Sequence, residues 1–228
     1  NRVRDMIKRP SPNFNERPAG TAIDMLVLHY TGMPTAADAL ARLSDPAAEV
    51  SAHYVIDEDG SLYQLVLEEH RAWHAGVAAW RGNTNINDRS IGIELVNPGH
   101  EFGYLPFTSA QMTILIPLTQ EIIPRHAIAA RDVVGHSDIA PIRKQDPGEL
   151  FDWADLANQG IGLWPGSGPP DKLSSDFGLA LEQYGYDITD LAAAIGAFQR
   201  HFRPSNCDGV ADTETENILC QLLALEDK

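Results

Sequence analysis

Two histidines and one aspartate, far apart in the chain, have the residue types of a catalytic metal site. His29 lies near the end of the apolar run MLVLHY (25–30), His136 ends the run DVVGH (132–136), and Asp146 follows ten residues later. Two imidazoles and one carboxylate can hold zinc and leave a fourth position open for water, as in hydrolytic sites. Because the spacing is non-local and forms no HExxH helix, each histidine could instead be a satisfied core or surface residue.

The segment SIGIELV (90–96) carries a carboxylate, Glu94, in an otherwise apolar strand pattern. Strand alternation puts the larger apolar side chains on one face and Ser90, Gly92 and Glu94 on the other. A carboxylate in such a strand is costly unless it is paired or lies at a cavity. We therefore expect Glu94 either to form a buried ion pair with an arginine or to act as a general base whose pKa is raised by burial.

Lys144 precedes Asp146 by two residues, in a loop rich in charges, prolines and glycines (135–153). An ammonium group near a metal ion could stabilise an oxyanion. The alternative is a solvated lysine on an exposed loop.

Strand patterns that alternate with helix patterns predict how these residues are positioned. Short apolar runs predict buried strands at 25–30, 90–96 and 132–136, and Asp59-Gly60 predicts the turn of a hairpin over 51–66. Helices are expected at 37–45, ending at Pro46, and from the capping box Thr108-x-x-Gln111 to His126, with a kink or an early break at Pro117. Residues 1–20 are predicted to be an irregular lead-in. The whole pattern favours an α/β (α+β) fold, with a central mixed β-sheet flanked by helices.

The sequence changes character after a stretch dense in glycine and proline (159–171). From residue 172 to 228 it holds helical patterns only, broken at Gly185, Pro204 and Asp208-Gly209, and Thr213-x-x-Glu216 is a second capping box. We therefore predict a catalytic domain at 1–164, a linker at 165–171 and a small all-α domain of three helices at 172–228.

Composition excludes some classes of function. The net charge of −15 argues against a nucleic-acid partner, because a phosphate backbone would be repelled. No apolar run reaches the length of a transmembrane segment, and a monomer is expected. Cys207 and Cys220 could form a disulfide, which would suit an oxidising compartment, or could be two buried thiols.

Five blocks of sequence together resemble the zinc-dependent N-acetylmuramoyl-L-alanine amidases, the bacterial cell-wall amidase family. The resemblance covers roughly residues 20 to 155, and the blocks occur in the family's order. They are LHYT (28–31), SAHYVIDEDG (51–60), WHAG (73–76), SIGIELVN (90–97) and GHSDIAPIRKQDPG (135–148).

This resemblance implies hydrolysis of the amide bond between the lactyl group of N-acetylmuramic acid and L-alanine, in peptidoglycan or muropeptides. It implies one zinc ion on His29, His136 and Asp146, with Glu94 as the catalytic acid/base and Lys144 as the electrophilic helper. Such a substrate would place the protein in the periplasm or cell envelope, or in the cytoplasm if it serves muropeptide recycling.

Three further polar residues are candidates near the site. His74, in the WHAG block, is expected to line the groove and contact substrate, or to be held by backbone carbonyls. Asn97 could bind substrate or cap the turn before Pro98. His53 is expected behind the metal site or in the core.

The C-terminal region resembles the three-helix peptidoglycan-binding module that often accompanies such enzymes, through LEQYGYDI (181–188), AIGAFQRHF (194–202) and DGVADTETENIL (208–219). Two other functions compete with the amidase. A non-catalytic peptidoglycan recognition protein would lack part of the metal set, and a zinc peptidase would cut within the stem peptide.

Overall fold

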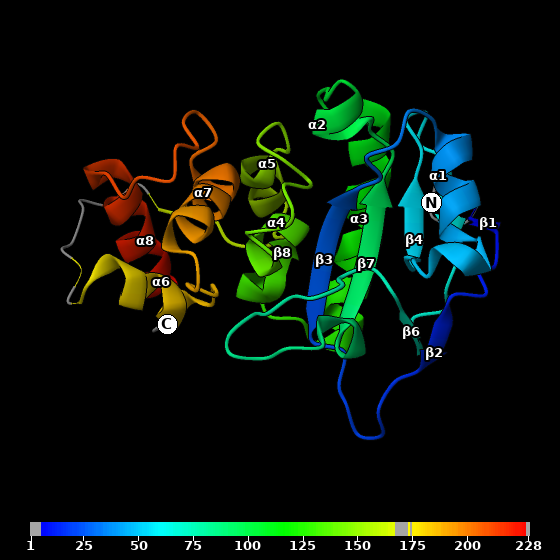
Figure 1. Cartoon of the computed structure of the whole chain (residues 1–228), viewed down its shortest axis with the longest axis horizontal. Coiled ribbons are helices and arrows are strands. Elements are labelled where there is room, and N and C mark those ends of the chain that lie inside the picture. The colour runs from blue at the N-terminus through cyan, green and yellow to red at the C-terminus, as the bar shows by residue number, and fades with distance from the viewer. Residues whose placement is uncertain (1–5, 167–172, 174, 227–228) are drawn as a thin grey trace.

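A mixed six-stranded sheet organises the first two thirds of the chain (Figure 1). The structure is a computed structural model, and it describes residues 6–166, 173 and 175–226. In spatial order the strands are β1 (Ile7–Lys8), β5 (Leu62–Gln64), β4 (Tyr54–Ile56), β7 (Ser90–Leu95), β3 (Met25–Tyr30) and β8 (Val133–Gly135). Strands β4, β7, β3 and β8 are parallel, β5 pairs antiparallel with β4, and β1 pairs parallel with β5.

The N-terminal lead-in is more regular than predicted. Besides β1, it contains β2 (Phe14–Glu16), which pairs antiparallel with β6 (His70–Ala72) as a separate two-stranded sheet. The prediction of an irregular segment over 1–20 is therefore wrong for these strands. Strands of two and three residues carry too little apolar periodicity to be recognised in a sequence.

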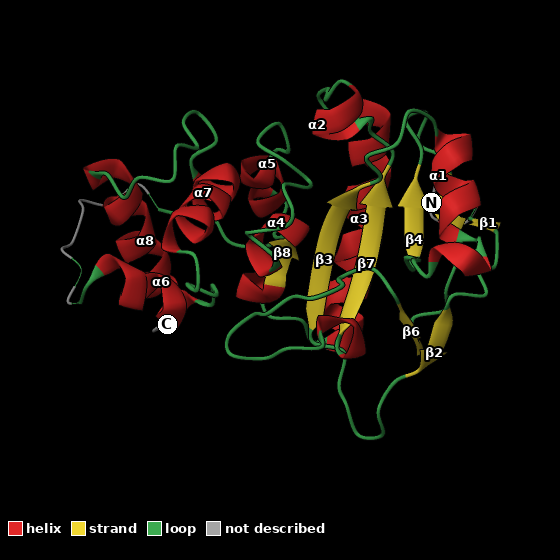
Figure 2. Cartoon of the chain, in the orientation of Figure 1, coloured by secondary structure: helices red, strands yellow, loops and turns green. Residues whose placement is uncertain are grey.

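A helix covers one face of the central strands, and the loop at 75–86 crosses the other (Figure 2). One face packs on α3 (Ser109–His126), whose capping box at Thr108 and Gln111 is present and whose course continues through Pro117 without the early break considered above. Because both faces are covered, Leu26, Val27 and Leu28 on β3 are all fully buried. The remaining helices of this part are α1 (Ala36–Leu43), α2 (Gly99–Phe102), α4 (His136–Ile139) and α5 (Trp153–Asn158).

Three helices follow, as predicted, and we refer to residues 175–226 as the helical unit. They are α6 (Phe177–Tyr184), α7 (Leu191–Phe202) and α8 (Thr213–Glu226). The predicted capping box at Thr213 is wrong, because the side chain of Asp212 instead accepts a hydrogen bond from the Thr215 amide. Most of the linker predicted at 165–171, namely residues 167–171, lies outside the described residues.

The helical unit and the sheet share one hydrophobic core. Met25, Val27 and Val134 on the sheet belong to the same buried cluster as Leu181 and Phe198 of the helical unit. Figure 1 shows α7 beside α4 and β8, at the edge of the sheet. The three helices are therefore packed onto the sheet by an extensive apolar contact.

Both cysteines are thiols, so the disulfide considered for Cys207 and Cys220 is not formed. In the described part of the chain, no helix has the length and apolar composition of a membrane span.

Candidate metal and catalytic site

Strand pairing brings the predicted ligands together. In the parallel β3–β7 pair His29 lies opposite Glu94, and in the β3–β8 pair Leu28 lies opposite Gly135. His136 therefore follows β8 directly beside the end of β3. Parallel strands end at the same edge of a sheet, which is where open α/β sheets build their sites.

The side chains of His29, His136 and Asp146 converge on one point. The Nδ1 atoms of the two histidines are 3.0 Å apart, and Asp146 Oδ2 lies 3.1 Å from His29 Nδ1 and 3.2 Å from His136 Nδ1. All three residues are buried. The backbone adds a further tie, because the Ser137 amide donates to the Asp146 carbonyl at 2.8 Å.

The protonation of His136 follows from its outer contact. Its Nε2 lies 2.9 Å from the carbonyl oxygen of Ala75, which can only accept a hydrogen bond. Nε2 must therefore carry the proton. In the neutral ring the other nitrogen, Nδ1, then faces Asp146 and His29 with a lone pair.

A chain of hydrogen bonds fixes His29 in the same way. Ser90 Oγ donates to the Ile86 carbonyl at 2.7 Å, so toward His74 Nε2, at 3.0 Å, it can only accept. His74 Nε2 thus carries the proton, and His74 Nδ1 accepts from His29 Nε2 at 2.9 Å. His29 Nδ1 is left as a lone pair aimed at the convergence point. We call this chain the Ser90–His74 relay.

Glycine at position 92 makes room for the Ser90–His74 relay. A Cβ at Gly92 would lie 2.5 Å from Cγ of the His74 ring. Burial lowers the pKa of His74 well below its usual value and, aided by His136, lowers the pKa of His29 to about 4. Both rings are therefore neutral at physiological pH, as the hydrogen-bond directions require.

These residues fit a metal ion. Two ring nitrogens and a carboxylate oxygen meet as acceptors with no donor between them, an arrangement that a cation satisfies. Burial opposes ionisation of Asp146, but its contacts with His136 and His29 outweigh burial and hold the pKa of the carboxyl well below its usual range. Nitrogen and oxygen donors in this number suit zinc and leave a coordination position open.

Glu94 lies on β7 next to this convergence point. Its Oε2 atom is inaccessible to solvent and has no hydrogen-bond partner among the described residues, while the residue lines the adjoining groove. Burial, followed by the neighbouring Asp146 carboxylate, raises the pKa of Glu94 well above its usual value, and Lys144 opposes the rise. The buried arginine ion pair considered above is absent around Glu94 in the described residues.

The site opens into a groove of about 430 Å³. Lys144 lines it, and its ammonium group has no hydrogen bond or ion pair with any described residue. Exposed Arg42 on α1 lines it too. Arg143 also borders the groove, but it donates to the carbonyls of Ala75 and Val77. The carboxylates of Glu94, Glu101 and Asp146 line the groove as well, so it presents charged side chains of both signs.

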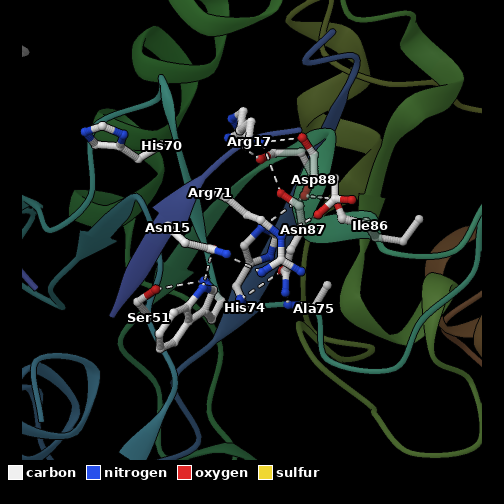
Figure 3. Close-up of polar contacts among 12 residues, drawn as sticks. Asn15, Arg17, Ser51, His70, Arg71, His74, Ala75, Ile86, Asn87 and Asp88 are labelled. Atoms are coloured by element: carbon white, nitrogen blue, oxygen red, sulfur yellow. Dashed lines mark hydrogen bonds and ion pairs between the residues drawn. The ribbon is translucent and has the colours of Figure 1, made fainter. Parts of the chain in front are cut away.

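A polar network supports the loop that carries His74 (Figure 3). Asn87 Oδ1 accepts from the amides of His74 and Ala75, at 3.1 and 2.8 Å. Arg17 in turn donates to the backbone carbonyls of Asn87 and Asp88, at 3.0 and 2.8 Å, and Figure 3 shows it reaching this turn. His53 is fully buried behind the site, and its Nδ1 accepts from the Gly92 amide at 3.0 Å.

The two candidate substrate contacts have different surroundings. His74 borders the groove, but both of its ring nitrogens are engaged in the Ser90–His74 relay. Asn97 is buried and donates to the Leu105 carbonyl at 2.7 Å while accepting from the Gly99 amide at 3.0 Å. This geometry matches the turn-capping alternative for Asn97 and does not support a substrate contact.

Sequence reasoning missed several residues of the site. Arg17 lies in the segment predicted to be irregular, and Ser90 was placed on the face of Glu94 without a role. Tyr30 and His100, which line the groove and are joined at 2.9 Å from Oη to Nδ1, had no sequence signal beyond their residue types.

Comparison with known proteins gives the family. The family model described as N-acetylmuramoyl-L-alanine amidase matches residues 19–149, more than half of the chain. AmiD of Escherichia coli (strain K12), an N-acetylmuramoyl-L-alanine amidase, is 42% identical over 230 residues, covering 88% of this chain and 82% of AmiD. A 1,6-anhydro-N-acetylmuramyl-L-alanine amidase, AmpD of the same organism, is 39% identical over 64% of this chain and 86% of AmpD.

Solved structures agree with these relatives. AmiD from E. coli, in complex with the substrate anhydro-N-acetylmuramic acid-L-Ala-D-gamma-Glu-L-Lys, superposes with a TM-score of 0.79 at 40% identity, covering 92% of this chain and 93% of that chain. AMPDH3 from Pseudomonas aeruginosa, in complex with anhydromuramic pentapeptide, gives 0.81 at 35% identity, covering 93% and 95%. These matches confirm the fold and the enzyme class that the motifs predicted: the chain belongs to the N-acetylmuramoyl-L-alanine amidase family.

Proposed function

We propose that this protein hydrolyses the amide bond between the lactyl group of N-acetylmuramic acid and L-alanine, using one zinc ion held by His29, His136 and Asp146. The observation that carries the proposal is the meeting of three acceptor atoms within 3.2 Å of one another. Beside them lies a Glu94 carboxylate oxygen that has no hydrogen-bond partner in the described part of the chain. A structural zinc site would instead use four protein ligands.

When bound, zinc supplies Lewis acidity and lowers the pKa of water in the site towards roughly 7. Glu94 acts as the general base that takes a proton from this water, and then as the acid that delivers the proton to the leaving L-alanine nitrogen. Its raised pKa suits both roles, because a carboxyl that holds a proton more tightly than usual can take one from water and pass it on.

Lys144 stabilises the negative charge that develops on the carbonyl oxygen during attack. Its ammonium group is free of hydrogen bonds to the described residues and lies on the groove, so it can turn toward a bound carbonyl. A donor that is aimed at developing charge in a secluded site contributes more than the same donor in water.

Muropeptide fragments with a 1,6-anhydro end are the first substrates to test. The relatives in complex carry anhydromuramic peptides, and AmpD is named for the anhydro substrate. A groove of about 430 Å³ that is lined by Lys144 and Arg42 can accommodate a peptide that carries carboxylates. Location in the periplasm or cell envelope stays a prediction, with cytoplasmic recycling as the alternative.

The test is mass spectrometry of digests of purified sacculi and of soluble anhydro-muropeptides, with zinc-loaded and zinc-stripped protein. The proposal expects release of intact stem peptide that begins with L-alanine, and only from the zinc-loaded protein. Truncated peptides would indicate the zinc peptidase instead. Binding of the fragments without any product would indicate the non-catalytic recognition protein.

A further inference from the structure

Asp138 is a buried carboxylate that no step of the proposed reaction uses. Its Oδ2 atom accepts from the Gly135 amide at 2.7 Å and pairs with His201 Nδ1 at 2.7 Å, and its Oδ1 atom accepts from the Tyr186 hydroxyl at 2.6 Å. Two of these three partners belong to the helical unit. Asp138 therefore connects the helical unit to the turn that begins with His136.

That turn, α4, is tied to two of the three proposed zinc ligands. His136 is its first residue, and the amide of Gly135, directly before it, is held by Asp138. The Ser137 amide holds the Asp146 carbonyl at 2.8 Å, and Arg200 on α7 donates to Ser137 Oγ at 2.5 Å. A displacement of α4 would therefore move both ligands.

Tight packing surrounds these polar contacts. The His201 ring stacks on Trp153 with ring centroids 3.8 Å apart, and Tyr186 packs edge-on against Trp80 at 5.1 Å. A Cβ at Gly185 would lie 2.9 Å from the Trp80 ring. Close packing of this kind transmits a shift in one element to its neighbour instead of absorbing it.

We propose that the helical unit is a positioning element of the metal site, which fixes α4, and with it His136 and Asp146, through Tyr186, His201 and Arg200. The inference rests on the proposed function, because it places zinc on His136 and Asp146. It adds a role for the helical unit that is separate from any binding of the cell wall. In the zinc-loaded enzyme, contacts outside the ligand shell then control how firmly two of the ligands are held.

The test uses the full chain, because the two parts share one core. Tyr186→Phe removes only the hydroxyl on Asp138 and keeps the ring on Trp80. Thr215→Val is the control, since Thr215 is also fully buried and all contacts of its hydroxyl lie within the helical unit. The hydroxyl donates to Asp212 at 2.7 Å and accepts from Gln199 at 3.2 Å and Arg203 at 2.9 Å. Arg200→Met removes the contact with Ser137 and serves as a second variant if Tyr186→Phe does not fold.

Two measurements are made on the wild type and each variant: the rate of zinc release to a chromogenic chelator, and the visible spectrum of the cobalt-substituted protein. We expect Tyr186→Phe and Arg200→Met to release zinc about tenfold faster, the lower end of effects from outer contacts, and to alter the cobalt bands. Thr215→Val should lower the unfolding midpoint without either change.

The outcomes separate this inference from the proposed function. Zinc release and cobalt spectra that match the wild type in Tyr186→Phe and Arg200→Met would overturn the positioning role and leave the metal site standing. A change of equal size in Thr215→Val would also overturn it, because general loosening of the helical unit would then explain the effect. A wild-type protein that binds no zinc would refute the metal site and the inference with it.

Discussion

Removal of the Ser90 hydroxyl tests whether the Ser90–His74 relay sets the protonation of His29, a proposed zinc ligand. In Ser90→Ala, His74 Nε2 loses its only acceptor among the described residues, and a buried donor without a partner costs about 1–3 kcal/mol. His74 can avoid that cost by moving its proton to Nδ1. His29 Nε2 would then have to accept, and His29 Nδ1 would carry a proton that points at the zinc position.

The expected magnitude follows from this competition between protonation states. Loss of an outer partner of a metal-bound histidine lowers metal affinity about 10–100-fold, which corresponds to about 1.4–2.7 kcal/mol. We therefore expect zinc affinity to fall by that factor in Ser90→Ala, as measured by competition with a chromogenic chelator. The unfolding midpoint of the zinc-free protein is measured in parallel.

Ser11→Ala is the matched control for Ser90→Ala. Ser11 is equally buried, donates to the Leu43 carbonyl at 2.6 Å and accepts from the Asn13 amide at 3.1 Å, with no link to the metal ligands. It should lower stability and leave zinc affinity unchanged. If Ser90→Ala lowered stability as much as Ser11→Ala but kept zinc affinity within about twofold, the relay would not control His29, and this reasoning would be refuted.

Four other predictions concern the reaction, the metal and stability. Glu94→Gln should lower kcat by about 10²–10⁴, because an amide cannot accept the proton as the carboxylate does. Zinc content and the unfolding midpoint should stay unchanged, which metal analysis and an unfolding curve would show. Near-normal turnover would exclude Glu94 as the general base. Lys144→Met should lower kcat by about 10²–10³ at full zinc content, whereas an effect confined to KM would contradict the role. Chelation should lower the melting temperature, and the shift should vanish in His29→Ala, which calorimetry would show. Glu68, although partly buried, has its pKa lowered by hydrogen bonds from Tyr54, His126 and Arg125. Its ionised form therefore stabilises the fold above the ordinary glutamate pKa of about 4.3, and this stabilisation should be lost as the pH falls below that value. Glu68→Gln should flatten that acidic part of the curve of unfolding free energy against pH.

Local patterns place the candidate ligands His29 and His136 at strand ends, whereas support for the full candidate set with Asp146 came from the family resemblance. His29 and His136 end apolar runs, and alternation within 90–96 places Glu94 opposite the buried face. Parallel pairing then brings those positions to one edge of the sheet, as the register of β3 with β7 and β8 shows. Apolar periodicity was therefore enough to predict where these strands lie in the sequence, and the family resemblance predicted how they are arranged in the sheet.

Contacts between distant segments could not be predicted in this way. The Ser90–His74 relay depends on how the loop at 73–76 crosses β7, which no local pattern encodes. Asp138 meets Tyr186 and His201, which are 48 and 63 residues away in the sequence. Helix caps and apolar stripes predicted three C-terminal helices, but they do not indicate which face packs against the rest of the protein. The buried cluster that the helical unit shares with the sheet therefore had no signal in the sequence.

The most direct test of the central claim is a crystal structure of the zinc-loaded protein, with anomalous diffraction data collected on both sides of the zinc absorption edge. The account predicts a single anomalous peak bonded to Nδ1 of His29, Nδ1 of His136 and the carboxylate of Asp146, with the Glu94 carboxylate facing the open position. A peak at any other site, a peak bonded to Nε2 of either histidine, or no peak in protein soaked with zinc would contradict it.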